Sequence, residues 1–256
     1  MSRLLAVTTL VFAASALAFA GDTPSFEWQA EMTPGQTLTV RAIAGNIVVN
    51  LVPGTQARVT ATKTGSGDLS LLQIHEVDSY RGPTICVIYP YNQDTCQPGS
   101  IEVRSNDMAV QFTISLPAGV LFEANNVNGD FHVSGITAPL TLTTVNGRLD
   151  LSGIGPVQGT TINGSITATY DALDWTGKST LTTVNGSIDM TLPSAASASI
   201  HASTVSGSVS SDFPLQVQGS LWGCTAGRVL TGTIGGGGRD LTLATVNGSV
   251  HIRKAQ

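Results

Sequence analysis

The sequence predicts an all-β protein, folded as a single-chain β-solenoid (β-helix) with stacked Asn-Gly corners at a period of about 17–22 residues. Two observations support this fold class. A Val-Asn-Gly motif, with small variations, recurs through the second half of the chain, and its glycines lie 18, 17, 22, 21 and 41 residues apart. Apolar residues occupy alternate positions after each motif, which is the pattern of a strand with one buried face. Such a period is typical of a stacked repeat.

The composition agrees with an all-β chain and argues against nucleic-acid binding. Of the 256 residues, 11% are charged and 5% aromatic, and the formal net charge is −5. A nucleic-acid binder normally shows a basic stripe or an aromatic stacking platform, and the sequence has neither. We therefore expect no nucleic-acid partner.

The first element is a predicted signal peptide, residues 1–20. Arg3 gives a positive start, residues 4–17 are largely apolar, and Ala18-Phe19-Ala20 is a small-x-small cleavage site. A membrane anchor is the alternative, but the apolar run is short for a span of about 20 residues. No later segment is long and apolar enough to cross a membrane. We expect an exported mature protein, periplasmic or secreted to the cell surface.

The second element, residues 21–111, is expected to be an irregular N-terminal β region. Leu38, Val40 and Ile43 alternate in part with polar residues, and Pro-Gly pairs interrupt the strands. Residues 43–49 resemble a first, degenerate coil. We expect the opening coils of the solenoid and a disulfide-bonded hairpin here, and a separate small β-domain is the alternative.

The three cysteines are Cys86, Cys96 and Cys224. An exported protein meets oxidising conditions, so one pair is expected to close. Cys86 and Cys96 flank a turn-rich stretch, and a disulfide between them would staple a hairpin with a stabilisation of about 2–3 kcal/mol. Cys224 is then left over as a buried thiol, although the two rival pairings stay open. The cysteines lack the spacing of metal ligands, so we expect no metal and no cofactor.

The third element, residues 112–256, is the predicted repeat solenoid. Aligned on the motif glycine, it shows apolar columns two residues before and two residues after the glycine, and a polar column three residues after it. The apolar columns predict one continuous core, which includes Val145, Leu149, Ile166, Val184, Ile188 and Val246. The polar column predicts an outward face of His132, Asp150, Thr167, Asp189, Ser210 and His251.

The motif itself is predicted to form the corners, since Asn and Gly tolerate a positive φ better than other residues. A hairpin meander is the alternative, because Asn-Gly between apolar residues also favours a two-residue hairpin. The regular spacing favours the solenoid, in which stacked asparagines about 4.8 Å apart could form an amide ladder. Gly227 lies where a coil without its motif would turn. The predicted structural corners are Asn128, Gly129, Asn146, Gly147, Asn163, Gly164, Asn185, Gly186, Ser206, Gly207, Asn247 and Gly248.

Three features carry a family resemblance. They are Leu116-Pro117-Ala118-Gly119, Asn126-Val127-Asn128-Gly129-Asp130, and the Thr-Val-Asn-Gly turns together with Thr204-Val205-Ser206-Gly207-Ser208-Val209. From about residue 112 to 253 the chain resembles the bacterial putative-adhesin domain family. The resemblance implies an exported or membrane-associated β-solenoid of poorly defined function, and it brings no catalytic residues to this sequence.

One candidate catalytic pair lies in the polar column. Asp150 and Asp189 share this column, but Thr167 stands between them, so their backbones should be about 9.6 Å apart, two strand spacings. This is too wide for a retaining glycosidase pair at about 5 Å and marginal for an inverting pair at about 6.5–9.5 Å. We therefore interpret Asp150 and Asp189 as two solvated surface carboxylates rather than a catalytic pair.

A second grouping would combine His132 and Asp150, on adjacent coils, with Ser165 or Ser187 one column away. No oxyanion element or nucleophile elbow accompanies these residues, so a surface ion pair is the preferred interpretation.

Two other features have a structural explanation. Gly235-Gly236-Gly237-Gly238 lacks the Lys-Ser/Thr and the helix of a phosphate loop, and a loop before the last strands is expected. Trp28, Trp175 and Trp222 could stack on sugars if they were exposed, but core packing is favoured.

We therefore expect a non-enzymatic exported β-solenoid, a putative adhesin or a binding or structural module of the cell envelope, with an unidentified carbohydrate or protein ligand. The alternative is a carbohydrate-active β-helix enzyme, a polysaccharide lyase or hydrolase. Such an enzyme needs clustered acids and bases, and the sequence shows them scattered, so we expect no catalytic residues.

Overall fold

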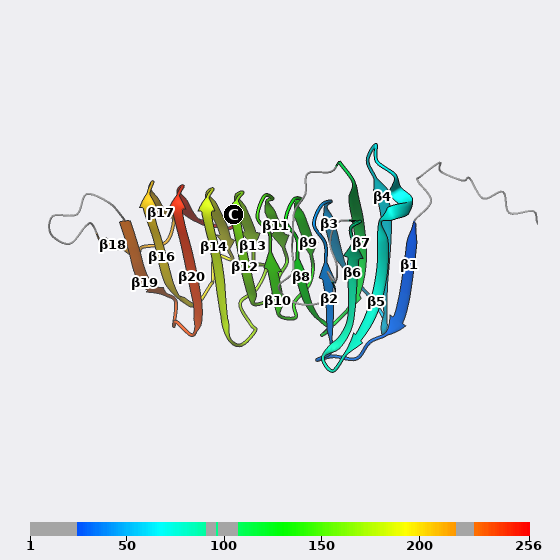
Figure 1. Ribbon diagram of the computed structural model, residues 1–256. Coiled ribbons are helices and arrows are strands. Elements are labelled where there is room, and N and C mark those ends of the chain that lie inside the picture. Colours follow the sequence, from blue (N-terminus) through cyan, green and yellow to red (C-terminus); the bar gives the residue numbers. More distant parts are fainter. Residues whose placement is uncertain (1–24, 91–95, 97–106, 219–227) are drawn as a thin grey trace, which may run out of the picture.

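The computed structural model describes residues 25–90, 96, 107–218 and 228–256. These residues form an all-β protein in which every element is a strand except the short 3₁₀ helix η1 (Leu69–Leu71). Figure 1 shows the strands side by side along one long axis, in two large sheets. The predicted signal peptide, Trp222, Cys224 and Gly227 lie outside the described residues. Within the described ranges, no helix is long and apolar enough to cross a membrane.

The two sheets run the whole length of the described chain, and their central strands are parallel. Sheet A has the order β1 (Phe26–Glu31), β4 (Gln56–Thr64), β7 (Ala109–Pro117), β3 (Ile47–Val52), β9 (Phe131–Ser134), β11 (Leu149–Ser152), β13 (Ile166–Thr169), β15 (Ile188–Leu192), β21 (Val250–Lys254), β17 (Val209–Ser211). Sheet B has the order β18 (Gln216–Gln218), β19 (Arg228–Ile234), β16 (Ala198–Ser206), β20 (Arg239–Asn247), β14 (Lys178–Asn185), β12 (Val157–Asn163), β10 (Leu140–Thr143), β8 (Leu121–Asn125), β2 (Thr37–Arg41), β6 (Gly82–Ile88), β5 (Gln73–Ser79).

Through the repeat, the chain alternates between the two sheets, and we call one passage through both sheets a coil. β10 and β12 belong to sheet B, whereas β11 and β13 belong to sheet A. Successive coils pair in parallel, with Leu149 opposite Ile166 and Ile166 opposite Ile188. Parallel pairing excludes a hairpin meander in this part of the chain. These three side chains are fully buried between the sheets, which confirms that part of the predicted core.

The apolar column two residues before the glycine lies in the core only at its first member, Val127, and the prediction is wrong for the later members. Ile162 is 42% exposed, Val246 39% and Val205 52%, and Val145 and Val184 are only partly buried. The strands of sheet B keep their alternation up to the motif, so the buried residue is the threonine just before each of these side chains. Five such threonines are buried: Thr144, Thr161, Thr183, Thr204 and Thr245.

The buried threonines have a defined hydrogen-bonding role. The Thr161 hydroxyl donates to the carbonyl of Gly147 at 2.9 Å, and the Thr183 hydroxyl donates to the carbonyl of Gly164 at 2.8 Å. Each threonine therefore satisfies a motif carbonyl of the neighbouring coil. An apolar residue at this position would leave that buried carbonyl without a partner, which is costly.

The motif glycines are required mainly by close packing between coils. A Cβ on Gly164 would overlap the carbonyl oxygen of Gly147, and a Cβ on Gly186 would overlap that of Gly164. Among the six motif glycines, only Gly129 and Gly207 have a positive φ, 151° in both. The predicted reason, a positive φ, is therefore wrong for the other four, where the absence of a side chain is what matters.

The last coil is inserted out of sequence order. β20 lies between β14 and β16, and β21 lies between β15 and β17. The motif residue Asn247 therefore stands between Asn185 and Ser206. The predicted extra coil turning at Gly227 falls outside the described residues, but β19, which begins at Arg228, runs antiparallel to β16 and is not a further parallel coil.

The N-terminal strands continue both sheets. β2 pairs in parallel with β8, and β3 pairs in parallel with β9. Ala44 forms a parallel bridge with Asn128, so residues 43–49 occupy the position of a coil before the first motif. β1, β4 and β5 add antiparallel strands at this end. β7 runs through the predicted division after residue 111, and this division stays a prediction.

A disulfide joins Cys86 to Cys96, the pairing that the sequence predicted. Their Cα atoms are 5.4 Å apart, and Cys86 is fully buried in β6. The Arg41 guanidinium, at the end of β2, donates a hydrogen bond to the carbonyl of Cys96 at 3.1 Å, so Cys96 is also bound to β2. The hairpin at this end is formed by β5 and β6, so Cys86 lies within its second strand and the hairpin turn precedes Cys86. The turn predicted between the two cysteines lies largely outside the described residues.

Candidate functional site

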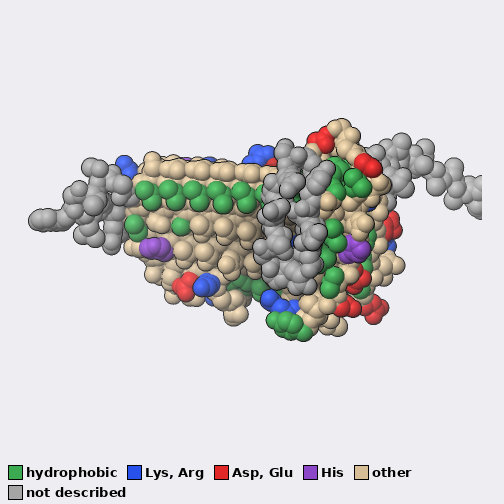
Figure 2. Space-filling view, viewed as in Figure 1, with side chains coloured by type: hydrophobic (Ala, Val, Ile, Leu, Met, Phe, Trp, Pro, Cys, Tyr) green, Lys and Arg blue, Asp and Glu red, His purple; other side chains and the backbone are tan. Residues whose placement is uncertain are grey.

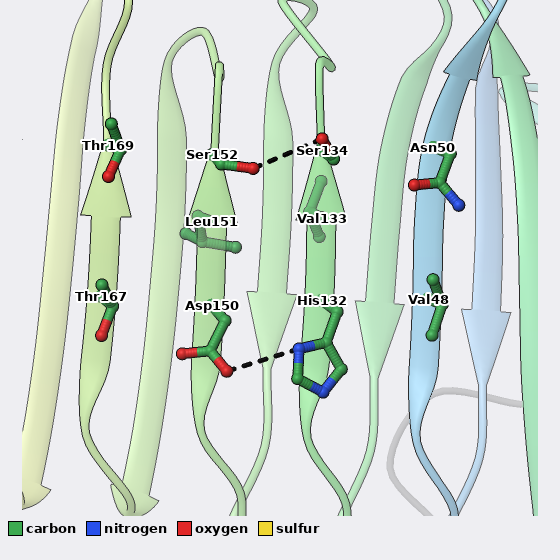
Figure 3. Close-up of a pocket in the computed structure, with 10 residues that line it drawn as sticks. All are labelled: Val48, Asn50, His132, Val133, Ser134, Asp150, Leu151, Ser152, Thr167 and Thr169. Carbon is green, nitrogen blue, oxygen red and sulfur yellow. Dashed lines mark hydrogen bonds and ion pairs between the residues drawn. The ribbon is translucent and has the colours of Figure 1, made fainter.

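The polar column lies on the outer face of sheet A. His132 on β9 stands opposite Asp150 on β11, and Asp150 stands opposite Thr167 on β13. Figure 3 shows these side chains in one row across the strands, with Ser134 and Ser152 in a second row. Together they line a shallow depression of about 380 Å³.

His132 and Asp150 form the ion pair that the sequence predicted, if the imidazole is protonated. The imidazole Nδ1 lies 3.3 Å from a carboxylate oxygen, and the side chains are 44% and 40% exposed. A pair exposed to this degree contributes little to stability because solvent screens it. Next to it, the hydroxyls of Ser134 and Ser152 lie 3.3 Å apart.

The second carboxylate of the column has a different partner. The Arg253 guanidinium donates to Asp189 at 2.7 Å, and this hydrogen bond, followed by the Coulomb attraction, raises the pKa of Arg253. Thr167 stands between Asp150 and Asp189 in the strand register. The two aspartates are therefore two strand spacings apart at the backbone, about 9.6 Å, and each has its own partner.

The two candidate serines serve the stacking of coils. The Ser165 hydroxyl accepts a hydrogen bond from the backbone N–H of Ser187 at 3.2 Å, and the Ser187 hydroxyl accepts one from the N–H of Ser249 at 3.3 Å. Within the described parts of the chain, neither serine is hydrogen-bonded to His132. The structure thus places the histidine and the aspartate together but does not add a nucleophile.

Sheet B presents a surface that the sequence analysis missed. The outward side chains before the motifs form a line across neighbouring strands, which we call the aliphatic row: Val145, Ile162, Val184, Val246 and Val205. Figure 2 shows a straight line of hydrophobic side chains along this face. Counting the alternation forward from the buried Leu142 would have found it, because Thr144 then points inward and Val145 outward.

The motif asparagines form a second line directly beside the aliphatic row. The Asn146 amide donates to Asn128 at 2.7 Å, and Asn163 donates to Asn146, Asn185 to Asn163 and Asn247 to Asn185, each at 2.8 Å. We call these side chains the amide ladder. Each donating amide uses one N–H within the ladder, and in the described structure its second N–H has no protein partner.

On the other side of the aliphatic row lies a line of small polar side chains, the hydroxyl column. It consists of Thr143, Thr160, Thr182, Ser203 and, in one coil, Ala244. The aliphatic row, the amide ladder and the hydroxyl column contain no charged residue. Together they form what we call the neutral ridge.

The remaining candidates have structural roles. Trp175 packs against the buried Tyr170, with ring centroids 6.0 Å apart, and burial raises the pKa of the Tyr170 phenol. Trp28 is partly buried against the core. Gly235 to Gly238 connect β19 to β20. Among the residues that the structure describes, no group of three His, Cys, Asp or Glu side chains is arranged to hold a metal ion.

A family model described as Toastrack DUF4097 matches residues 30–253. The chain belongs to this family. The match covers both the irregular N-terminal strands and the repeat, and it confirms the resemblance to the putative-adhesin domain family, whose function is unknown. No curated protein matches the chain.

Three solved structures are similar to this chain at low identity. A putative cell adhesion protein from Clostridium sporogenes has 14% identity and a TM-score of 0.49 over 91% of this chain and 100% of its own. A putative adhesin from Bacteroides fragilis has 13% identity and a TM-score of 0.30 over 92% and 100%. A putative lipid binding protein from Parabacteroides distasonis has 12% identity and a TM-score of 0.34 over 92% and 98%. At these values the likeness carries no argument about function.

Proposed function

We propose that this Toastrack protein is an exported, non-enzymatic binding or structural module of the cell envelope, of the adhesin type. In this proposal the alternating passage between two sheets is a β-solenoid, and the motif residues are its stacked corners. The parallel strand register and the amide ladder support this architecture. A stack of this kind is rigid and displays its side chains in regular lines, which suits extended contacts with a surface.

The observation that carries the proposal is the separation of the acidic groups on sheet A. Thr167 stands between Asp150 and Asp189, and each aspartate is already engaged with a partner of its own. General acid–base catalysis needs groups that converge on one reacting atom within hydrogen-bond reach. The depression beside His132 is shallow, and among the described residues none of its serine or threonine hydroxyls is hydrogen-bonded to His132.

The competing proposal is a carbohydrate-active β-helix enzyme, a polysaccharide lyase or hydrolase. It would have to use Asp150 and Asp189 across about 9.6 Å of backbone separation, just above the range of about 6.5–9.5 Å between the carboxyl groups of inverting glycosidases. Asp189 is already engaged with the Arg253 guanidinium at 2.7 Å, and a catalytic role would require it to leave this contact. This alternative therefore has less support.

Export is proposed from the leader-like first twenty residues and from the disulfide between Cys86 and Cys96. Disulfides persist in oxidising compartments such as the periplasm and the cell exterior. The periplasm and the cell surface are both compatible with these features.

The experiment is a binding and turnover assay on the purified mature protein, residues 21–256. Insoluble chitin, cellulose and isolated peptidoglycan are offered, and bound protein and released reducing sugar are both measured. We expect binding without turnover. Sugar release by the wild-type protein that disappears in both Asp150→Asn and Asp189→Asn would refute the proposal and place an active site on sheet A.

A further inference from the structure

Most of the aliphatic row is exposed, and apart from Val145, which packs against the core, its side chains are not part of the hydrophobic cluster between the sheets. Three of its five members are between 39% and 52% exposed, and they stand on three different strands, β12, β20 and β16. Single exposed aliphatic residues are ordinary on a protein surface, but an aligned series is the type of surface that marks an interaction site. At one strand spacing per residue, the row is about 19 Å long.

The lines on either side of the row supply hydrogen-bonding groups in the same register. The amide ladder leaves one N–H of each donating asparagine without a protein partner in the described structure, and Asn146, Asn163, Asn185 and Asn247 are all exposed. The hydroxyl column adds partly exposed hydroxyls on the other side. A ligand on this ridge therefore meets an apolar centre with polar groups along both edges and no charge.

We propose that the neutral ridge binds a single linear, uncharged glycan chain, laid along the long axis of the molecule. This proposal rests on the binding function proposed above, and it names the class of ligand and the place where it binds. A pyranose ring has C–H groups on its faces and hydroxyls around its edge. The faces would cover the aliphatic row, while the hydroxyls exchange hydrogen bonds with the asparagine amides on one side and the threonine hydroxyls on the other.

An extended peptide fits the ridge less well than a glycan does. Peptides that add to a β-sheet bind at an edge strand, where free backbone groups offer main-chain hydrogen bonds. Four members of the aliphatic row stand on β12, β14, β20 and β16, Val145 follows β10, and each of these strands is paired on both sides. Recognition there must use side chains alone, which favours a ligand with hydroxyls along both edges.

A lipid acyl chain and a second copy of the protein also fit less well. An acyl chain would cover the asparagine amides and the threonine hydroxyls without offering them a hydrogen bond, and this desolvation opposes binding. A stable protein interface needs about 800 Å² from each partner, and a ridge a few side chains wide and about 19 Å long does not provide it.

The test compares two lysine substitutions on one coil of the full mature chain. Ile162→Lys places a charge in the aliphatic row, and Thr167→Lys places the same charge on sheet A. Both wild-type side chains are exposed, so both variants should fold, and thermal melting checks this. Isothermal titration with chitohexaose and cellohexaose measures binding. We expect the dissociation constant to rise by about tenfold or more in Ile162→Lys and by less than about twofold in Thr167→Lys.

Val205→Lys is the second variant, because Val205 lies at the end of the row and is 52% exposed. It should also weaken binding, and it provides the test if Ile162→Lys does not fold. Two results overturn the inference while leaving a binding function in place. One is an equal or larger loss in Thr167→Lys. The other is binding of an uncharged extended peptide or of phosphatidylcholine vesicles, but of neither glycan. A protein that binds no chitin, cellulose, peptidoglycan, peptide or vesicle would instead overturn the proposed function itself.

Discussion

Two isoleucines on one coil provide a direct test of which side chains form the core. Ile162, near the end of β12, is 42% exposed, whereas Ile166, at the start of β13, is 0% exposed. The motif columns of the sequence assign both residues to the core, and the structure assigns only Ile166 to it. The same substitution should therefore have different costs at two positions four residues apart.

The expected magnitudes follow from burial. Ile166 lies between Leu149 and Ile188 on the neighbouring strands, so Ile166→Ala leaves a cavity in a packed site and should lower the free energy of unfolding by about 2–5 kcal/mol. Ile162 keeps nearly half of its surface in water, so Ile162→Ala should cost about 1 kcal/mol. The difference in the free energy of unfolding should be larger for the corresponding aspartate substitutions, because Ile166→Asp buries an unpaired carboxylate and Ile162→Asp leaves the carboxylate hydrated.

Urea denaturation followed by circular dichroism measures the free energy of unfolding of the alanine variants, and soluble expression reports on the aspartate variants. Equal losses for Ile162→Ala and Ile166→Ala would refute the outward position of the aliphatic row. They would also remove the basis for a ligand site on sheet B, since the row would then belong to the core.

Four further outcomes are expected, three of them in the same denaturation assay. Thr183→Val keeps the shape of the side chain but leaves the carbonyl of Gly164 without its hydrogen bond, and it should cost about 1–3 kcal/mol; an unchanged value would contradict that role. Gly164→Ala should cost about 3 kcal/mol or prevent folding, because the added methyl overlaps the neighbouring backbone. Asn185→Ala removes two ladder hydrogen bonds and should cost about 1–2 kcal/mol, whereas a loss near zero would make the ladder energetically silent. A non-reduced digest should yield one peptide pair that joins Cys86 to Cys96, and a link from either of them to a third cysteine would contradict the observed pairing.

The strand pattern after each glycine could be predicted because one physical constraint dominates there. Leu149, Ile166 and Ile188 alternate with polar residues, and a strand with one buried face has no other way to arrange them. The ion pair of His132 with Asp150 followed from the same alignment, since stacked coils bring equivalent positions to neighbouring strands.

The residues before each glycine were assigned to the wrong face because hydrophobicity is an incomplete guide where a buried polar group has a partner. Thr161 and Thr183 are buried since their hydroxyls satisfy backbone carbonyls of the neighbouring coil. Their polar character therefore reports an internal hydrogen bond rather than exposure to water. Hydrophobicity alone instead predicts that the apolar Val184, next in the chain, is the buried residue.

The stacking order near the C-terminus could not be read from the spacing of the motifs. Local periodicity determines that β20 and β21 form a coil, but it does not determine which coil they join. In the structure they occupy the place beside β14 and β15, and β16 and β17 are displaced by one position. Such an insertion depends on contacts between residues that are far apart in the sequence, and an alignment of the repeats contains no information about these contacts.

The motif residues differ in what the fold demands of them. The glycines are needed for the close approach of the backbones, the threonines satisfy buried carbonyls, and the asparagines bond to one another. No comparable demand acts on the exposed members of the aliphatic row, Ile162, Val246 and Val205. Threonine is β-branched too and fits a strand as well as valine does, and it occupies the hydroxyl column two residues earlier in three of the five coils of the row. If β-propensity alone set the composition of this face, hydroxyl-bearing and aliphatic side chains would be mixed along both lines. The row is aliphatic in every one of these coils, and for its exposed members this uniformity agrees with the proposed ligand contact on sheet B.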